Sequence, residues 1–496
     1  MSSFWQQLTL STLPLQQWRE VSYLHFLVGP LRNWRRGSRL MQWADWIGLG
    51  LISLVFGLAP FVSNTLLAVL LSASAIFWVL LTLSDDVRVD LGERSSPEES
   101  ETLSGRGKAA LVDWFAPAAG TPLVTPIHLL VLLYWGISVV ATAFSPVKQA
   151  ALIGLNKLTL YLLFFALMAR VLRSPRARTW IITVYLLVAL IVSVYGLQQW
   201  FSGTTALATW VDPMSPLSKT TRVYSFLGNP NLLAAYLIPS VVFSILAIFI
   251  WPTWMTRGLA AVMAIVNGSC LVLTFSRGGW IGLMVAILAM ALLLAHWWSV
   301  YLPRFWRTWA VPLVVAGAAS VLILGVVFVE PLRDRVFSMF SGRGDSSNNY
   351  RINVWQAVIE MIQDRPLLGI GPGNTAFNKI YPLYQRPRFS ALSAYSIILE
   401  VAVETGIIGL TCFLWLLLVI FTQGWTQLQR LRDRADRQGY WLMGAIATLL
   451  GLLGHGLFDT VLYRPDVNTL WWLMIAMIAS FSVRPTPSTI AIRSGL

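Results

Sequence analysis

Residues 232–251 read LLAAYLIPSVVFSILAIFIW, an apolar run without a charged side chain. A helix of about 20 such residues crosses the ~30 Å hydrocarbon core of a bilayer. The run is continuous rather than alternating in polarity, which favours a helix over a barrel strand. The whole chain has the same character, because 56% of its 496 residues are hydrophobic, 12% are charged and its mean hydropathy is +0.66. The sequence therefore predicts an all-α polytopic membrane protein.

The apolar runs divide the chain into about 12 predicted transmembrane helices. They cover 46–63, 65–84, 127–144, 150–169, 179–201, 232–251, 258–276, 279–300, 309–329, 395–421, 440–463 and 467–483. The predicted organisation is a basic tail (1–45), nine spans with an acidic loop at 85–113 (46–329), a long loop (330–394), three spans (395–483) and a C-terminal tail (484–496). The first thirty residues lack the pattern of a cleavable signal peptide. Cys270 and Cys412 lie inside apolar runs, so we expect no disulfide framework, metal or cofactor.

Basic residues between the spans predict the orientation. With a cytoplasmic N-terminus the inside segments hold 22 Lys and Arg, including RVLRSPRAR (170–178) and QRLRDRADR (429–437), against five in the short outside loops. The positive-inside rule then places both termini in the cytoplasm. The net charge of +14 is therefore mainly a topology signal and a contact surface for membrane lipid, and nucleic acid is not an expected partner. Many of the 24 tryptophans fall at span ends, as an aromatic belt requires.

Four arginines break this charge pattern on the predicted outer face: Arg222, Arg277, Arg351 and Arg464. Each could contact lipid headgroups or a local carboxylate such as Asp459. Arg277, however, sits in the tight turn Ser276–Gly279, where neighbouring glycines admit a close approach. Bidentate guanidinium groups match phosphate oxygens, so arginines converging on one outer cavity would suit a pyrophosphate-sized anion.

The long loop carries further elements. From Arg351 to Asp364 the apolar residues fall on one helical face, which predicts an amphipathic helix on the outer membrane surface that ends before Pro366. The following GIGPGN (369–374) lacks the third glycine and the preceding strand of a dinucleotide fingerprint. It predicts a turn, with an anion-binding backbone nest as the alternative.

Ionisable residues inside spans are costly and are candidates for function. His455 and Asp459 are four apart in the eleventh predicted span, where they could form a hydrogen bond, and Glu400 and Glu404 share this spacing in the tenth. Lys157 lies within the fourth. The alternative for these groups is a buried structural network that ties helices together.

The order of several motifs resembles the O-antigen ligase and polymerase superfamily (Wzy_C-like), and within it the cyanobacterial IctB family, which is assigned to bicarbonate transport. The resemblance covers about residues 130–483. It rests on FLGNPNLLAAYL (226–237), TFSRGGWIGL (274–283), YRINVWQAV (350–358) with DRPLLGIGPGN (364–374), EVAVETGIIGL (400–410) and HGLFDTVLYRPDVNTLWW (455–472).

The resemblance implies a metal-independent transfer of a glycan from polyprenyl pyrophosphate to an acceptor hydroxyl, with arginines such as Arg222, Arg277 and Arg351 stabilising the leaving pyrophosphate. Such ligases carry a histidine within a Ser-Ala-His-Asn pattern before the Val-Glu-Thr-Gly segment. This chain reads Ser393-Ala394-Tyr395-Ser396 there. Tyrosine, with a pKa near 10, is a poor general base at neutral pH unless an arginine lowers that pKa. Glu400 and His455 are the other candidates for this role.

Two functions follow as hypotheses. The first is binding, and perhaps transfer, of a polyprenyl-pyrophosphate-linked saccharide at the periplasmic face of the plasma membrane. The alternative is transport of bicarbonate, or an accessory role in inorganic carbon accumulation, with a thylakoid location also open. A transporter would place its anion site near the midplane between inverted repeats, and no convincing repeat is present in the sequence. The charge distribution favours the one-sided saccharide site, and the oligomeric state stays open.

Overall fold

A computed structural model of the chain describes residues 2–10, 38, 40–84, 114–115, 124–203, 222–328, 333 and 346–483. The regular elements of these residues are all helical. The α-helices are α1 (Ser2–Leu8), α5 (Ala44–Leu58), α6 (Asn64–Leu83), α10 (Pro126–Ala143), α11 (Lys148–Val171), α12 (Pro175–Ser202), α13 (Pro230–Ile250), α14 (Trp254–Leu273), α15 (Arg277–Trp298), α16 (Arg304–Phe328), α18 (Ser346–Asp364), α19 (Asn374–Ile380), α20 (Ile397–Asp433), α21 (Gly439–Gly456) and α22 (Pro465–Ser480). The predicted acidic loop 85–113 and tail 484–496 lie outside the described residues.

The predicted fold class is confirmed. Among the described residues, eight helices are long and apolar enough to cross a membrane: α6, α10, α11, α12, α13, α14, α15 with the 3-10 turn that follows it, and α20. The number twelve stays a prediction, because α5, α16, α21 and α22, which correspond to the other four predicted spans, are not among these eight. Pro, Ser, Thr or Asn begins several of these helices; Asn229, for instance, accepts hydrogen bonds from the first backbone N–H groups of α13.

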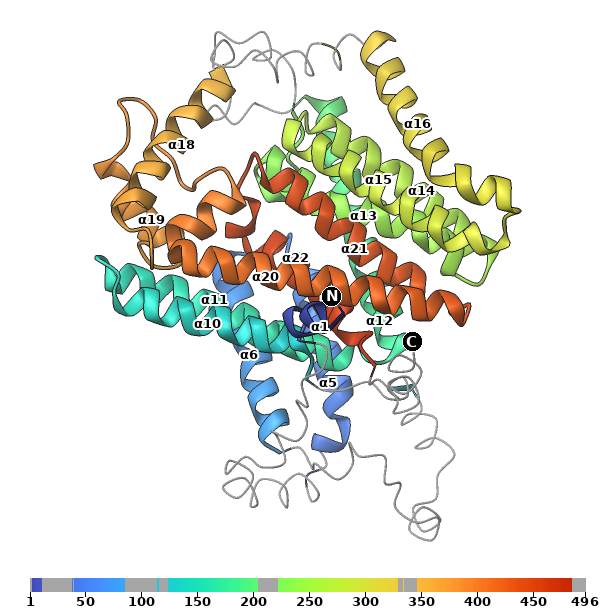
Figure 1. Cartoon of the computed structure of the whole chain (residues 1–496), viewed down its shortest axis with the longest axis horizontal. Helices are drawn as coiled ribbons and strands as arrows, with labels where there is room; N and C mark the ends of the chain where they lie inside the picture. Colours follow the sequence, from blue (N-terminus) through green and yellow to red (C-terminus); the bar gives the residue numbers. More distant parts are fainter. Residues whose placement is uncertain are drawn as a thin grey trace.

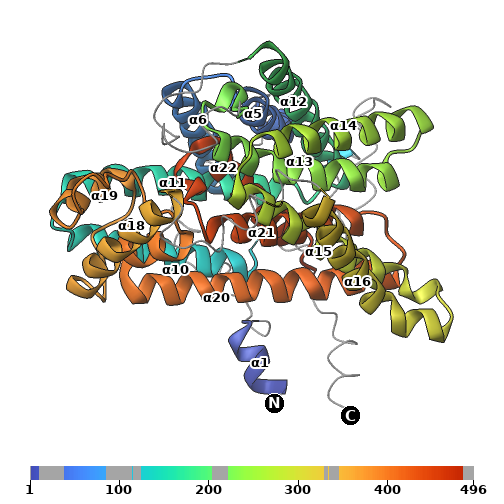
Figure 2. The same cartoon turned by 90° about the horizontal axis from the view of Figure 1, so that it is seen from above.

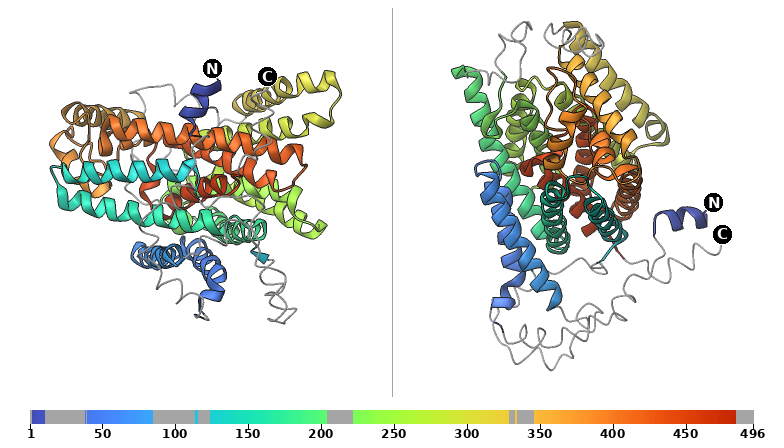
Figure 3. Two further views of the ribbon diagram at one scale, coloured as in Figure 1. Left: turned by 60° about the horizontal axis from the view of Figure 1, so that its bottom comes forward. Right: turned by 90° about the vertical axis from the view of Figure 1, so that its left-hand side faces the viewer.

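The helices form one bundle around a continuous apolar core. Helices α10, α11 and α20 run side by side, with α18 and α19 packed at one of their ends (Figure 1). Seen from above, α16 lies at the opposite end of the molecule from α18 and α19 (Figure 2). The α5–α6 pair packs on α11 and α12 and crosses α10 and α11 at a steep angle (Figure 3).

Small residues hold the centre of the bundle together. Helices α15 and α21 approach closely where Gly282 and Gly451 face each other, since a Cβ on Gly451 would stand 2.7 Å from the Gly282 carbonyl oxygen. Lipid tails are as apolar as the helices, so close van der Waals contact rather than water exclusion stabilises such an interface. Gly451 therefore serves helix packing, in agreement with the usual role of glycine within spans.

Helix α20 differs from its predicted span of 395–421. It continues to Asp433, so most of the predicted inside loop 429–437 is helical. It is also broken at Gly406, whose backbone has φ 67° and ψ −170°. The break frees the Ile407 N–H, which donates to the Pro366 carbonyl at 2.8 Å. A side chain at 406 would collide with the Leu367 carbonyl, so only glycine fits this crossing. The short helix 397–405 is thereby fixed to the long loop.

The predicted amphipathic helix is present as α18, and it ends at Asp364 as expected. The prediction that its apolar face lies on the membrane surface is wrong for the central residues. Val354, Ala357, Val358 and Met361 are buried in a second core cluster with Phe377 and Tyr381. The loop folds back as a small helical unit, so this face packs against protein. Among the apolar side chains of this stretch only Ile359 stays well exposed, at 45%.

Candidate functional site

Three of the four outer arginines come together beside the C-terminal end of α21. Arg222 precedes α13, Arg277 is the first residue of α15, and Arg351 lies in the second turn of α18. The guanidinium of Arg222 is fixed from two sides, with Nε donating to the Thr274 carbonyl at 2.9 Å and a terminal nitrogen donating to Asn231 Oδ1 at 3.3 Å. Three separate segments thus bring their cations to one place, which we call the arginine cluster: Arg222, Arg277 and Arg351.

One buried carboxylate faces this cluster. Asp459, 6% exposed, accepts a hydrogen bond from Asn231 Nδ2 at 2.6 Å, and Asn231 in turn binds Arg222. Arg351 Nε donates to the carbonyl of Phe458, the residue before Asp459, at 2.8 Å. Burial raises the pKa of Asp459, while the charges of Arg351 and Arg222 and the Asn231 hydrogen bond oppose that rise. The carboxylate is therefore held in place but is harder to ionise than a free aspartate.

The first turn of α18 completes the arrangement. Arg277 donates to Asn348 Oδ1 at 3.0 Å, and Arg351 donates to Ser347 Oγ at 2.8 Å. The apolar periodicity of the sequence predicts a helix that begins only at Arg351, so it does not identify Ser347 and Asn348 as partners of the arginines. Asn348 and Asn231 carry no distinctive pattern, although Asn231 does stand within the FLGNPNLLAAYL motif.

The described residues bring three guanidinium groups together with one carboxylate, that of Asp459. Burial, helped by the neighbouring charges of Arg351 and Arg277, lowers the pKa of Arg222 to about 10, so this guanidinium is still charged at neutral pH. A partly enclosed group of arginines suits a phosphate or pyrophosphate group, which guanidinium forks bind in a bidentate manner.

Tyr395 lies at the edge of this region, just before α20. Its ring packs edge-to-face on Tyr350 with the centroids 5.8 Å apart, and its carbonyl accepts from Trp355 Nε1 at 3.4 Å. Its backbone has φ 51°, an uncommon conformation for a bulky residue. Burial raises the pKa of Tyr395, and the nearby Tyr350 and Asp459 raise it further. The arginine-induced lowering that would make this phenol a base is not seen, and the phenol stays protonated at neutral pH.

Glu400 and Glu404 each hold a loop to the short helix 397–405. Glu400 Oε2 accepts from the Ala394 N–H at 2.6 Å and lies 3.5 Å from the Thr460 hydroxyl, which accepts from the Ser396 N–H. It thereby fixes the backbone on both sides of Tyr395. Both contacts of Glu400 are with the protein itself, which fits a structural network.

Glu404 binds the GIGPGN turn. Its Oε1 accepts from the Gly373 N–H at 2.7 Å, and its carbonyl accepts from the Gly371 N–H at 2.9 Å. The backbone donors of this turn that the sequence suggested for an external anion are therefore directed at a carboxylate and a carbonyl of the same chain. This favours the turn over the nest.

The expected pair of His455 and Asp459 is not formed. Helix α21 ends at Gly456, so Asp459 leaves the helical face on which four-residue spacing would have brought the two together. His455 is completely buried against the backbone of Gly278 and Gly282 on α15, and neither ring nitrogen has a hydrogen-bond partner among the described residues.

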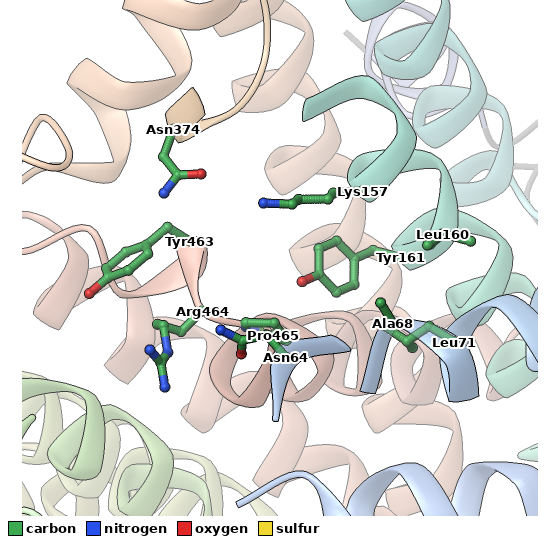
Figure 4. Close-up of a pocket in the computed structure, with 10 residues that line it drawn as sticks. All are labelled: Asn64, Ala68, Leu71, Lys157, Leu160, Tyr161, Asn374, Tyr463, Arg464 and Pro465. Atoms are coloured by element: carbon green, nitrogen blue, oxygen red, sulfur yellow. The ribbon is translucent and has the colours of Figure 1, made fainter. Parts of the chain in front are cut away.

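Arg464 does not join the arginine cluster. It lies 3.7 Å from the Asp466 carboxylate and lines a separate cavity of about 240 Å³ between α6, α11 and the start of α22. Lys157 lines the same cavity (Figure 4). Within the described part of the chain, no group of three or more His, Cys, Asp or Glu side chains is placed to hold a metal ion.

Comparison with known proteins bears on part of this site. The family model described as O-antigen ligase matches residues 259–414. The matched stretch contains Arg277, Arg351 and Tyr395, whereas Arg222 and Asp459 lie outside it. No curated protein matches the chain. The chain is thus a multi-pass membrane protein similar to O-antigen ligases over this stretch, and the match gives no support for bicarbonate transport.

Proposed function

We propose that the protein binds a polyprenyl-pyrophosphate-linked saccharide at the arginine cluster and transfers the saccharide to an acceptor hydroxyl. The observation that carries the proposal is the convergence of Arg222, Arg277 and Arg351 from three separate segments. The match to O-antigen ligases covers two of the three arginines. Part of the proposal is that this face lies on the periplasmic side of the plasma membrane with both termini in the cytoplasm, which the charge bias of the loops supports.

The arginines serve the reaction through charge. As the acceptor oxygen forms its bond to the anomeric carbon, the bond from that carbon to the pyrophosphate breaks, and negative charge accumulates on the leaving phosphate oxygens. Guanidinium groups already fixed by Thr274, Asn348 and Phe458 need no reorganisation to stabilise this charge.

The acceptor hydroxyl must lose a proton during this step. Tyr395 remains protonated and His455 is enclosed, so neither is suited to accept it. Asp459 is the carboxylate of the cluster, and its raised pKa brings it closer to the range in which a carboxylate works as a general base. We assign it the proton-accepting role, with Tyr395 as a hydrogen-bond donor at the edge of the site.

Native mass spectrometry of the purified protein with polyprenyl pyrophosphate tests the binding step. We expect a bound species for the wild type, a loss of roughly tenfold or more in affinity for Arg277→Ala, and a smaller loss for Arg277→Lys, which keeps the charge but not the fork. Arg386→Ala is the control, because Arg386 is an exposed arginine of the long loop, outside the arginine cluster, and is paired loosely with Glu360 at 3.9 Å. Equal losses for Arg277→Ala and Arg386→Ala, or no binding by the wild type, would contradict the proposal.

A further inference from the structure

The cavity lined by Arg464 and Lys157 lies beside α11, separate from the arginine cluster. Its volume is about 240 Å³, and residues from α6, α11, α19, α22 and the turn before α22 line it. Its wall is partly apolar, through Ala68, Leu71 and Leu160, and partly polar. The amine of Lys157 and the hydroxyl of Tyr161 extend from α11 into this space, and the amide of Asn374 approaches it from the opposite side (Figure 4).

Lys157 is the unusual member of this wall. It is the tenth residue of α11, about 14 Å along the helix from its first residue at a rise of 1.5 Å per residue. In the described part of the chain it has no ion-pair or hydrogen-bond partner. Its side chain is exposed rather than buried in the protein. An amine that has no partner of its own and is directed into a cavity is available to an anionic group of a ligand.

Arg464 adds a second cation on the other side of the cavity. Its one ion-pair partner, Asp466, is 3.7 Å away, and its buried Nε has no hydrogen-bond partner. Lys157 and Arg464 together carry two positive charges against the single carboxylate of Asp466, so the cavity keeps a surplus of one. Hydroxyl and amide groups from Tyr161, Tyr463 and Asn374 can satisfy the remaining oxygens of an anion.

We infer that this Lys157 cavity binds one singly charged anionic group, a phosphate diester or a carboxylate, carried on a saccharide or on a lipid headgroup. Pockets for drug-sized ligands have volumes of about 300–1,000 Å³, so 240 Å³ accommodates a headgroup or one sugar ring rather than an oligosaccharide. The partly apolar wall suits the carbon skeleton of such a ligand.

The two sites are close but chemically distinct. Asp459 of the arginine cluster and Arg464 of the Lys157 cavity are five residues apart, so their Cα atoms are separated by at most about 18 Å. A ligand held in the cavity would therefore lie within reach of a saccharide bound at the cluster. The Lys157 cavity does not depend on the function proposed for the arginine cluster, because neither of its cations, Lys157 and Arg464, belongs to that cluster.

Lysine labelling of the wild-type protein tests the proposal without a mutation. Acetic anhydride would be applied to the protein in phosphatidylcholine nanodiscs, in nanodiscs that also contain phosphatidylglycerol, and with a hexose phosphodiester or a hexuronic acid in solution. Modification of Lys157 is measured by mass spectrometry relative to Lys148, which lies at the start of the same helix and outside the cavity lining. We expect severalfold protection of Lys157 by at least one probe. Protection by phosphatidylglycerol alone identifies a lipid headgroup, and protection by a sugar acid or diester identifies a saccharide.

Variants supply the second readout. Lys157→Met removes the charge at similar length and should weaken binding of the protecting probe, measured directly by native mass spectrometry, roughly 10- to 100-fold, whereas Lys157→Arg and Lys148→Met should change that binding little. Arg277→Ala should leave protection of Lys157 unaltered, which separates this inference from the function proposed for the arginine cluster. The absence of protection by every probe, or equal binding by Lys157→Met and the wild type, would overturn the inference.

Discussion

The contact between α11 and the GIGPGN turn leads to a quantitative prediction for Gly154→Ala. A Cβ at position 154 would stand 1.8 Å from the Pro372 carbonyl oxygen and 2.9 Å from the Gly373 Cα. The shortest relaxed carbon-to-oxygen contacts in proteins are about 3.3 Å, so the turn would have to retreat by about 1.5 Å. The methyl group cannot yield, because it is fixed to the helix backbone.

That retreat has a calculable cost. The Gly373 N–H, next to Pro372, donates to Glu404 at 2.7 Å, and a displacement of this size would take the pair out of hydrogen-bonding range. A lost hydrogen bond to a charged group costs about 1.5–3 kcal/mol, and overpacking costs about 1–3 kcal/mol. We therefore expect Gly154→Ala to lower the free energy of unfolding by about 3–5 kcal/mol. It should also raise amide hydrogen exchange at the turn, near 371–374.

Unfolding in mixed detergent micelles, followed by tryptophan fluorescence, measures the change in stability. Gly136→Ala is the matched control, since Gly136 lies within α10 and a Cβ there would meet no atom within 4 Å. Alanine is the better helix former by about 1 kcal/mol, so the control should be neutral or slightly stabilising. The reasoning is refuted if Gly154→Ala costs no more than Gly136→Ala, or if exchange at the turn stays unchanged.

Three further substitutions probe the arginine cluster and its surroundings. Asp459→Asn removes one negative charge; at roughly 10 Å and an effective dielectric constant of about 20, this is worth about 1.7 kcal/mol, so native mass spectrometry should show carrier binding that is roughly 10- to 20-fold tighter. A transfer assay with the same variant should show almost no product, and unchanged transfer would remove Asp459 from the mechanism. Because burial raises the pKa of Tyr395, the phenol is neutral on both sides of pH 7, and Tyr395→Phe should lower carrier binding equally from about pH 6 to 9; a loss confined to the alkaline end would contradict this. Glu400→Gln should cost about 1–3 kcal/mol in the same unfolding assay, because its bond to the Ala394 N–H loses its charge, and full stability of this variant would argue against that contact.

Only part of the site could be predicted from the sequence. Arg222, Arg277 and Arg351 are recognisable because each lies on the predicted outer side, where the short loops carry few basic residues, or in a motif of the long loop. Arg464 also departs from this charge bias, yet it lines a different cavity. The charge bias predicts on which side of the membrane a residue lies, but not where on that side it lies. Asn231 and Asn348 are ordinary polar residues whose importance appears only where they contact an arginine.

The sequence by itself determined the fold class and most helix positions, because the bilayer imposes length and polarity on each span separately. It could not place His455 relative to Asp459, since the end of α21 at Gly456 depends on packing rather than on apolar character. Nor could it show that the apolar face of α18 is covered by protein. A hydrophobic stripe has the same pattern against lipid and against a neighbouring helix, and only the tertiary structure decides between them.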